Sequence, residues 1–380
     1  MRISVLTSLY PIPALPFEGI FAARRWEAMA QRGHDIRVLA PTPWAPLPIG
    51  SYRDIAGAPR HEIRSGIPVH RPRYLHIPKR ALPNAKRFAK LALKYLDPKT
   101  DVVVCDYAWP ASMIAPALQQ AGVACVINGR GSDVLQVMGE ADLKTHLVSN
   151  LKAAGNWCAV SQDLVDAMDG LAGAEGHGLL VPNGVDSEHF APGDRVDARQ
   201  RLGLPIGGPL VLVVGHLIQR KDPLLGLNAF AQGAPADARL CFVGRGPLVE
   251  ALKAETDRLG LQDRILLAGE RPPEELLHWY RAADLVMLTS TREGRPNVVL
   301  EALSCGTPVL ATNAGGTGEL LPDARFLSES RDPIQLGSML ADLLNTPPAS
   351  AELRAIAGPL SWESSIQTLE ACLERARSGR

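Results

Sequence analysis

The sequence predicts an α/β protein built from two Rossmann-like domains. Short apolar runs, such as residues 2–7 and 210–214, alternate with amphipathic helical segments, as parallel strands alternate with crossover helices. A stretch rich in proline and glycine, residues 187–209, separates two series of this kind. A length of 380 residues is typical of two domains. We therefore expect one domain over residues 1–184 and a second over residues 185–360.

Bulk composition excludes several classes of protein. No run approaches the ~18 consecutive apolar residues of a membrane-spanning helix. The apolar run at the N-terminus is too short for a signal peptide and lacks the flanking segments of one. The six cysteines, at positions 105, 125, 158, 241, 305 and 372, stand singly in apolar contexts. We expect them to be core residues of a cytoplasmic protein, not disulfides or metal ligands. The nine histidines are scattered, so no metal site is expected.

Charge is distributed unevenly, although the net charge is zero. Residues 1–99 contain 17 Lys and Arg against 6 Asp and Glu, and the rest of the chain carries the opposite excess. The basic part predicts an anionic partner, either membrane phospholipid or a phosphorylated acceptor. Nucleic acid is not expected as a partner.

The first series opens with a strand at residues 2–7, a proline-rich loop that ends at Gly19, a helix at residues 20–32 and a strand at residues 36–40. In such a unit the loop lies at the carboxyl end of the sheet, where ligands bind. The chain lacks the G-x-G-x-x-G fingerprint, which argues against an NAD-dependent dehydrogenase.

A basic segment without any acidic residue follows at residues 79–96. From Asn84 onward its pattern is helical, with Phe88 and Tyr95 on the apolar side and lysines on the other. Residues 79–94 either contact an anionic membrane or form the solvated face of a helix packed on the core. The residues alone leave both interpretations open.

Further strands are expected at residues 102–105 and 123–127. Arg130 comes after the second of these strands, between two glycines that permit close approach of the backbone. Its place beside the expected ligand crevice favours a functional role over a surface turn. Ser132 or Asp133 can cap the helix that follows, and Ser161 is expected to cap a helix at residues 162–167.

The second series begins with the strand at residues 210–214. Gly215 and His216 follow it, and two adjacent cations, Arg220 and Lys221, come shortly after. A diphosphate at the carboxyl end of this strand would require such neutralisation. Later strands are followed by Gly244 and, after residues 265–268, by Glu270.

The most informative stretch is residues 283–309. A buried parallel strand at residues 283–288 leads into a loop that contains Glu293, Gly294 and Pro296. A helix is expected to open near Asn297 as N-cap, so that the amides of Val298 and Val299 favour an anion. Glu301 lies one turn later. Carboxylates accept hydrogen bonds from sugar hydroxyls, so amides flanked by two carboxylates predict a nucleotide-sugar.

With these residues in view, the chain resembles the retaining glycosyltransferase family 4. This family has the GT-B fold, in which two Rossmann-like domains face each other across a cleft. The resemblance covers nearly the full length. Its strongest part is Glu293-Gly-Arg-Pro-Asn-Val-Val-Leu-Glu301 followed by Ala-Leu-Ser-Cys-Gly-Thr-Pro-Val. Supporting matches are Val181-Pro-Asn-Gly-Val-Asp186, Gly215 through Lys221, Gly244-Arg-Gly-Pro247, Gly315-Gly316 and Gly131-Ser-Asp133.

The resemblance implies a role for each of these positions. Glu301 would bind the ribose hydroxyls and Glu293 the hydroxyls of the donor sugar. Arg220 and Lys221 would hold the diphosphate, helped by amides near Asn297 and by Gly19. Catalytic residues would be Glu293, Arg220, Lys221 and Arg130. Donor-binding residues would be Gly19, Gly215, His216, Gly244, Glu270, Gly294, Pro296, Asn297, Val298 and Glu301.

The sequence departs from the family pattern at two positions. Many relatives carry His where Arg130 stands and Arg where His216 stands. Arg220 and Lys221 are then the remaining cations of the loop after the strand at residues 210–214. Either this loop binds the diphosphate more weakly than in relatives, or Arg130 supplements its charge.

The resemblance therefore predicts a hexosyltransferase that retains anomeric configuration and requires neither metal nor cofactor. The donor would be a UDP-sugar, with GDP-mannose as the other donor considered, and the acceptor a saccharide or a lipid-linked saccharide of polysaccharide or glycoconjugate biosynthesis. The first domain would take the acceptor, the second the donor, and residues 361–380 would form a helix that crosses back to the first. The enzyme would act in the cytoplasm or at the inner face of the membrane. A catalytically silent nucleotide-sugar binder and a sugar-nucleotide epimerase are the alternatives.

Overall fold

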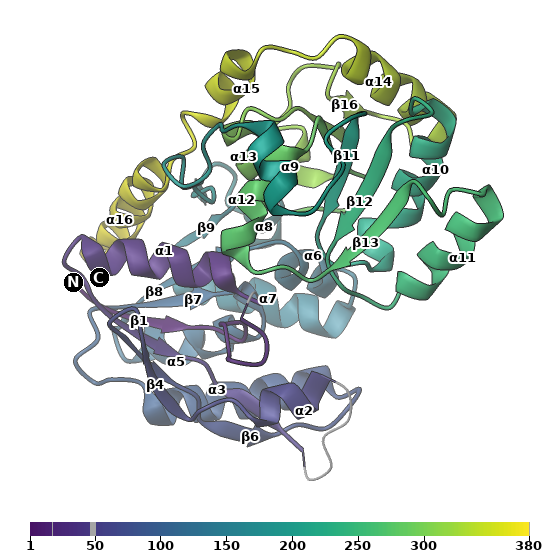
Figure 1. Cartoon of the computed structure of the whole chain (residues 1–380). Coiled ribbons are helices and arrows are strands. Elements are labelled where there is room, and N and C mark those ends of the chain that lie inside the picture. The colour runs from purple at the N-terminus through teal and green to yellow at the C-terminus, as the bar shows by residue number, and fades with distance from the viewer. Residues whose placement is uncertain (17, 46–50, 380) are drawn as a thin grey trace. The chain divides into compact units, whose positions relative to one another are not determined.

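A computed structural model describes residues 1–16, 18–45 and 51–379. Contacts between residues divide the chain into two compact units. Unit 1 contains Met1–Gly184 and Trp362–Arg380, and unit 2 contains Val185–Ser361. Each unit is a largely parallel sheet covered by helices (Figure 1), which confirms the predicted α/β class of two Rossmann-like domains.

The sheet of unit 1 has eight strands in the order β10-β9-β8-β7-β1-β2-β5-β4. Neighbouring strands are parallel except for the antiparallel pair of β4 and β5. Its central strands are buried along their whole length and are mainly apolar, because helices bury both faces. The bounds are β1 Arg2–Leu6, β2 Asp35–Leu39, β4 His61–Arg64, β5 Ile67–His70, β7 Val102–Asp106, β8 Ala124–Gly129, β9 Trp157–Ala159 and β10 Leu179–Leu180. A separate parallel pair joins β3 Thr42–Trp44 to β6 Arg73–Leu75.

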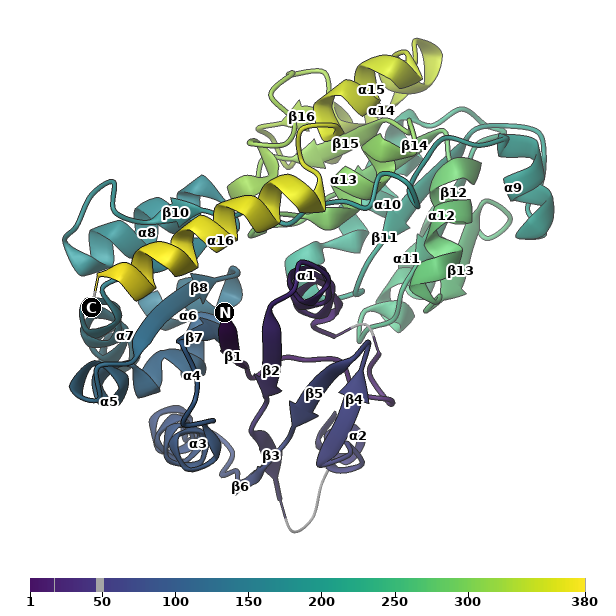
Figure 2. The same ribbon diagram turned by 90° about the vertical axis from the view of Figure 1, so that its left-hand side faces the viewer.

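Helices cover the unit 1 sheet in two layers. One core contains Trp26 and Met29 of α1 with Ile366 and Leu369 of α16, and the other contains Phe88 of α3. The final helix α16 packs on α1, β7 and β8 (Figure 2), so the predicted return of the chain to the first domain is confirmed. The helices are α1 Ile20–Gln31, α2 Ser51–Ala56, α3 Ala81–Tyr95, α4 Ala108–Ala111, η1 Ser112–Ile114, α5 Ala115–Gln120, α6 Ser132–Met138, α7 Ala141–Ala154, α8 Gln162–Ala172 and α16 Trp362–Ser378.

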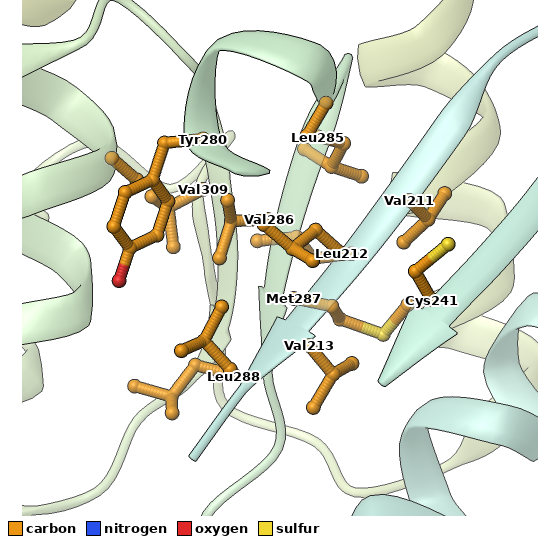
Figure 3. Packing of buried hydrophobic residues seen from close by; sticks show 14 of the residues in the cluster. Val211, Leu212, Val213, Cys241, Tyr280, Leu285, Val286, Met287, Leu288 and Val309 are labelled. Carbon is orange, nitrogen blue, oxygen red and sulfur yellow. The ribbon is translucent and has the colours of Figure 1, made fainter. Parts of the chain in front are cut away.

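Unit 2 is built on six parallel strands in the order β13-β12-β11-β14-β15-β16. Its core forms where side chains of β11 and β14 meet, including Leu212 and Met287 (Figure 3). The strands are β11 Leu210–Val214, β12 Arg239–Val243, β13 Ile265–Gly269, β14 Leu285–Leu288, β15 Val309–Thr312 and β16 Leu327–Ser328. The helices are α9 Arg195–Arg201, η2 Gln219–Lys221, α10 Pro223–Gly233, α11 Val249–Leu259, α12 Pro273–Ala282, α13 Asn297–Ser304, η3 Gly315–Thr317, α14 Pro333–Asn345 and α15 Ser350–Ala357.

The strand order of unit 2 positions the site. Counted from β11, it is the order 3-2-1-4-5-6 of doubly wound sheets, in which the first and fourth strands are neighbours. The chain therefore leaves β11 and β14 in different directions, and a crevice opens beyond their carboxyl ends. The loops after these two strands are the ones that carry Lys221 and Glu293.

Two predicted helix caps are wrong, and a third is right in position only. Helix α13 begins at Asn297 itself, with Pro296 as the N-cap, and α6 has Gly131 as its N-cap. Ser161 is the N-cap of α8, as predicted, but its side chain makes no capping hydrogen bond. The hydroxyl of Ser161 is buried without a partner among the described residues. Helix α6 follows Gly131, whose φ of 134° sets the entry of the chain in place of a side-chain hydrogen bond.

Candidate functional site

The candidate site is built from the loops that follow β11 and β14 in unit 2. The backbone N–H of Thr291 donates to the carbonyl of Arg220 (2.8 Å), and the Thr289 hydroxyl donates to the carbonyl of Asp222 (2.8 Å). These bonds join segments about seventy residues apart in sequence. A small hollow at this point is lined by residues of both loops, among them Gly215, His216 and Lys221.

Glu293 lies at the centre of this loop cluster. Its carboxylate accepts from Lys221 Nζ (2.5 Å) and from the Ser290 hydroxyl (2.5 Å), and Arg220 Nη1 lies 3.5 Å from its other oxygen. The residue is 7% exposed. The two cations and one of the two carboxylates predicted from the sequence therefore lie together.

The electrostatics of Glu293 follow from these partners. Burial by itself raises the pKa of the carboxyl group, because it penalises the charged form. The charge and hydrogen bond of Lys221, the Ser290 hydroxyl and the charge of Arg220 outweigh burial, so the pKa lies below its ordinary value. Glu293 is thus an anion at neutral pH, held in one orientation by its cations.

Glycines allow neighbouring loops to close around Glu293. Gly315 has a φ of 55°, and a Cβ there would lie 2.1 Å from the carbonyl oxygen of Glu293. On the other side, a Cβ on Gly244 would lie 1.9 Å from the carbonyl oxygen of Gly215. A side chain at Gly315 or Gly244 would force the loops apart, which explains why glycine stands at these strand ends.

Glu301 lies one turn into α13 and is 5% exposed. The hydroxyl of Tyr280, on α12, donates a 2.8 Å hydrogen bond to its carboxylate and so orients it. At the start of the same helix the side-chain oxygen of Asn297 is buried and has no partner among the described residues. A buried acceptor without a donor is costly, and a bound hydroxyl or amino group would satisfy it.

The remaining residues predicted in unit 2 lie around these loops. Gly294 is half-buried, and its carbonyl accepts from the N–H of Gly316 (3.1 Å). Pro296 precedes α13, and Val298 is half-buried in its first turn. His216 is exposed immediately after Gly215. Glu270 follows β13 and pairs with Arg245 (3.1 Å).

Arg130 belongs to unit 1 and is held by a network of its own. Its guanidinium donates to both oxygens of Asp106, at 2.6 and 2.9 Å, and to the side-chain oxygen of Asn183 (3.2 Å). Burial would raise the pKa of Asp106, but the charge and hydrogen bonds of Arg130, together with the charge of Arg25 and the hydrogen bond of Trp26, outweigh burial and the pKa is lowered. The positive charge of Arg130 is therefore matched by a carboxylate that sequence reasoning did not identify.

Gly19 is also in unit 1, where it precedes α1 with a φ of 75°. A Cβ at this position would lie 2.8 Å from the carbonyl oxygen of Leu9. The close backbone approach accounts for the glycine whether or not a ligand contacts it.

Three residues of these networks were missed by sequence reasoning. Tyr280 reads as one more apolar residue of an amphipathic helix, and Ser290 as a polar residue after a strand. Asp106 ends an apolar strand and carries no motif. Only the fold brings Tyr280 and Asp106 to their partners, because they lie 21 and 24 residues from Glu301 and Arg130, whereas Ser290 is three residues from Glu293.

The basic helix α3 has an outward face formed by Lys86, Lys90 and Lys94. It packs against β6, where Leu75 is 44% exposed and is the register partner of Trp44, which is 43% exposed. Within the described ranges, no helix is long and apolar enough to cross a membrane. The six cysteines are buried and unpaired, as predicted for core residues.

Two family models match this chain. The model described as Glycosyltransferase Family 4 matches residues 22–189, and that described as Glycosyl transferases group 1 matches residues 194–358. The putative teichuronic acid biosynthesis glycosyltransferase TuaC of Bacillus subtilis is 30% identical over 336 residues, which cover 84% of this chain and 83% of that protein. A D-inositol 3-phosphate glycosyltransferase of Acidothermus cellulolyticus is 35% identical over 253 residues, 61% of this chain and 54% of the relative.

Solved structures of similar fold cover the whole chain. HepE of Anabaena in complex with UDP has a TM-score of 0.77 at 22% identity, covering 99% of this chain and 100% of the other. Sucrose-phosphate synthase of Thermosynechococcus elongatus has a TM-score of 0.81 at 20% identity, with full coverage of both chains. At these identities the likeness establishes the shared fold.

Proposed function

Because this chain belongs to glycosyltransferase family 4, we propose that it moves a hexose from a UDP-sugar to a saccharide or lipid-linked acceptor with retention of anomeric configuration. The observation that carries this proposal is the cluster of Glu293, Lys221 and Arg220 at the switch point of unit 2. It places two cations and an oriented anion where doubly wound sheets bind ligands.

The donor would be bound by groups that the fold already orients. Lys221 has three N–H donors, one of which Glu293 takes, so Lys221 and Arg220 can also hold a diphosphate. The amides at the start of α13 suit the same diphosphate, and the unpartnered oxygen of Asn297 would accept from a hydroxyl of the donor. Glu301, oriented by Tyr280, would accept from the ribose hydroxyls.

Each group has a chemical task in the proposed transfer. Positive charge on Lys221 and Arg220 stabilises the diphosphate as negative charge develops on its leaving oxygen. Glu293 positions both cations and accepts hydrogen bonds from the donor sugar. The acceptor hydroxyl attacks on the face from which the diphosphate departs, and its proton passes to the leaving phosphate oxygen. These roles require no metal or cofactor.

The identity of the donor and acceptor is proposed from similar proteins. HepE, a structural neighbour, has been solved with UDP and with UDP-glucose, which supports UDP as the nucleotide. TuaC is described as an enzyme of teichuronic acid biosynthesis, which supports a polysaccharide acceptor.

Incubation with radiolabelled UDP-, GDP- and ADP-sugars tests the proposal. We expect transfer or slow hydrolysis with a UDP-sugar, unchanged by EDTA, and an α-linked product from an α-linked donor by NMR. Inversion would refute the retaining mechanism, and loss of activity in EDTA would refute metal independence. Tight UDP binding without turnover on any acceptor would assign the chain as a nucleotide-sugar binder.

We also propose that unit 1 contacts the anionic inner surface of the membrane. Helix α3, which carries the exposed lysines, packs against β6, the strand of the exposed Leu75, and residues 79–96 contain no acid to repel phosphate headgroups. Sedimentation with phosphatidylglycerol vesicles is expected, and binding should fall in a Lys86→Glu/Lys90→Glu variant. Equal binding of the variant and the natural chain would refute membrane contact through α3 and would show that its lysines only face solvent.

A further inference from the structure

Three strands at one end of the unit 1 sheet are buried on only one face. These strands, β2, β5 and β4, lie at the end of the sheet away from α16 (Figure 2). Their alternate residues pack into the core that contains α1; they are Ile36, Val38, Ile67 and Val69. The residues between them point to the opposite face, which is exposed or half-buried; they are Arg37, Pro68, His70, His61 and Ile63.

A pocket of about 490 Å³ lies over this open face. Strands β2, β5 and β4 line it together with Ser4 of β1, Tyr95 at the end of α3, and residues 96–97. Its volume falls within the ~300–1,000 Å³ of pockets that hold small molecules, and its lining is mainly apolar, as in such pockets. It lies on a face of the sheet and shares no residue with the site of unit 2 or with the network around Arg130.

Flat rings form much of the lining. The imidazoles of His61 and His70 are stacked with centroids 4.2 Å apart and an angle of 15° between their planes. The ring of Tyr95 meets His70 edge-on at 4.8 Å. Beside them, Ile63 is 77% exposed and Tyr95 is 44% exposed. Ile63 and Tyr95 therefore give this part of the pocket an exposed apolar surface that is available to a ligand.

The charged groups of the lining are already paired. Arg37 lies 2.9 Å from Asp97 and 3.7 Å from Asp35, and Glu62 lies 2.7 Å from Arg71. The pKa of His70 is lowered by burial and by His61, so the His70 imidazole carries little charge at neutral pH. The pocket thus offers hydrogen-bonding side chains at its edge and no excess of either charge.

We propose that this pocket binds a neutral saccharide of the glycan chain, apart from the site of transfer. A pyranose has C–H groups on its faces and hydroxyls around its edge. Its faces match the imidazole and tyrosine rings, and its hydroxyls match the Arg37–Asp97 pair, which can donate and accept at once. The lining offers an anionic lipid or nucleotide no cation that is not already paired, and Lys94, which is outside the lining, lies over the Tyr95 ring at 5.4 Å from its centroid.

Saturation-transfer NMR on the full chain tests the site. The probes are methyl glucopyranoside, methyl mannopyranoside, methyl N-acetylglucosaminide and cellobiose, with glucuronate and AMP as anionic comparators. Excess UDP is present throughout, so that a sugar at the proposed donor site is displaced. We expect saturation transfer to at least one neutral sugar, strongest at its ring C–H protons, and none to the comparators.

Matched variants locate the binding. His61→Ala combined with Ile63→Ser should lower the affinity about tenfold, whereas His146→Ala, on α7 of the same unit, should leave it unchanged. Hydrogen exchange of peptides from β1 and β7 serves as the measure of unit 1 folding and should be equal in all three proteins.

Several outcomes would overturn the proposal. Absence of saturation transfer to every neutral probe would do so, as would binding that survives the double variant. Preference for glucuronate or AMP would refute the neutral ligand. A concentration-dependent dimer that Ile63→Ser abolishes would assign the face to a second copy of the chain. Failure of UDP binding alone would refute the donor proposal and leave this pocket unaffected.

Discussion

The ion pair of Lys221 and Glu293 is expected to stabilise unit 2, unlike most ion pairs of the surface. Lys221→Met removes a cation that is 20% exposed and lies 2.5 Å from a carboxylate that is 7% exposed. Breaking a buried pair by removing one partner costs about 3–5 kcal/mol. Ser290 and Arg220 remain as partners of Glu293, so we expect a loss of about 2–3 kcal/mol at about pH 7.5.

The loss should shrink as the pH falls. In the natural chain the pKa of Glu293 is lowered, so its contribution is present above the ordinary carboxyl pKa and is lost as the pH falls through the folded value. Without Lys221, burial is less opposed and the pKa shifts upward. Protonation then relieves the variant at about pH 5, where the difference in free energy of unfolding should be smaller than at about pH 7.5.

Hydrogen exchange across urea concentrations, followed by mass spectrometry of peptides from β11 and β14, reports the free energy of unfolding of unit 2. Lys253→Met is the matched control, because Lys253 also pairs with a glutamate, Glu250, at 2.8 Å but is 55% exposed. That variant should change the free energy by less than about 0.5 kcal/mol. The double variant Lys221→Met/Glu293→Gln should recover most of the loss. If Lys221→Met costs no more than Lys253→Met, the ion pair has no structural role.

Three other substitutions test other contacts. Tyr280→Phe removes the donor to Glu301 and should weaken UDP binding about tenfold by calorimetry, since a hydrogen bond to a charged group contributes about 1.5 kcal/mol. Gly315→Ala places a Cβ 2.1 Å from a backbone oxygen and should destabilise unit 2 by about 2 kcal/mol or more, measured by the same exchange experiment. Arg130→Met leaves the buried Asp106 without its cation and should destabilise unit 1 by about 3 kcal/mol, less at low pH because Asp106 then protonates.

Controls separate each contact from general damage. Tyr52→Phe, which removes a hydroxyl that contacts His76, should leave UDP affinity unchanged. Gly207→Ala, in open space, should cost less than about 0.5 kcal/mol. Unchanged UDP binding in Tyr280→Phe would show that orientation of Glu301 is unimportant. A stable Gly315→Ala would show that the loops are not in close contact.

The sequence indicated which loops carry the site but not how their side chains pair. Glu293 stands out because it follows an apolar run and precedes a helix, and Lys221 because it adjoins a second cation after another run. Their contact depends on β11 and β14 being neighbours in the sheet, although Lys221 and Glu293 lie 72 residues apart. The adjacency of β11 and β14 depends on the order of the strands in the sheet, which local sequence patterns do not encode.

The wrong cap predictions have a related cause. Asn297 and Ser161 have side chains that favour the N-cap position, yet Asn297 lies inside its helix, and Ser161, although it is the N-cap residue, makes no capping hydrogen bond. The preference of such a side chain for the N-cap position contributes about 1 kcal/mol. Several backbone hydrogen bonds and close glycine contacts that fix a loop together contribute more than this. Around Asn297 the carbonyls of Glu293 and Gly294 are in contact with Gly315 and Gly316, so the loop geometry decides where α13 begins.

This loop geometry bears on how one carboxylate could serve both binding and reaction. In the structure Glu293 holds Lys221 and Arg220 near each other, although like charges repel. A diphosphate that binds these cations would bring a second anion close to Glu293, and repulsion would weaken the hold of Glu293 on Lys221. Lys221 would then shift its interaction towards the phosphate as negative charge grows there, which is stabilisation stronger in the transition state than in the ground state. A Glu293→Gln variant should accordingly bind UDP about as well as the natural chain but transfer the sugar far more slowly, and equal losses in binding and in turnover would contradict this division of roles.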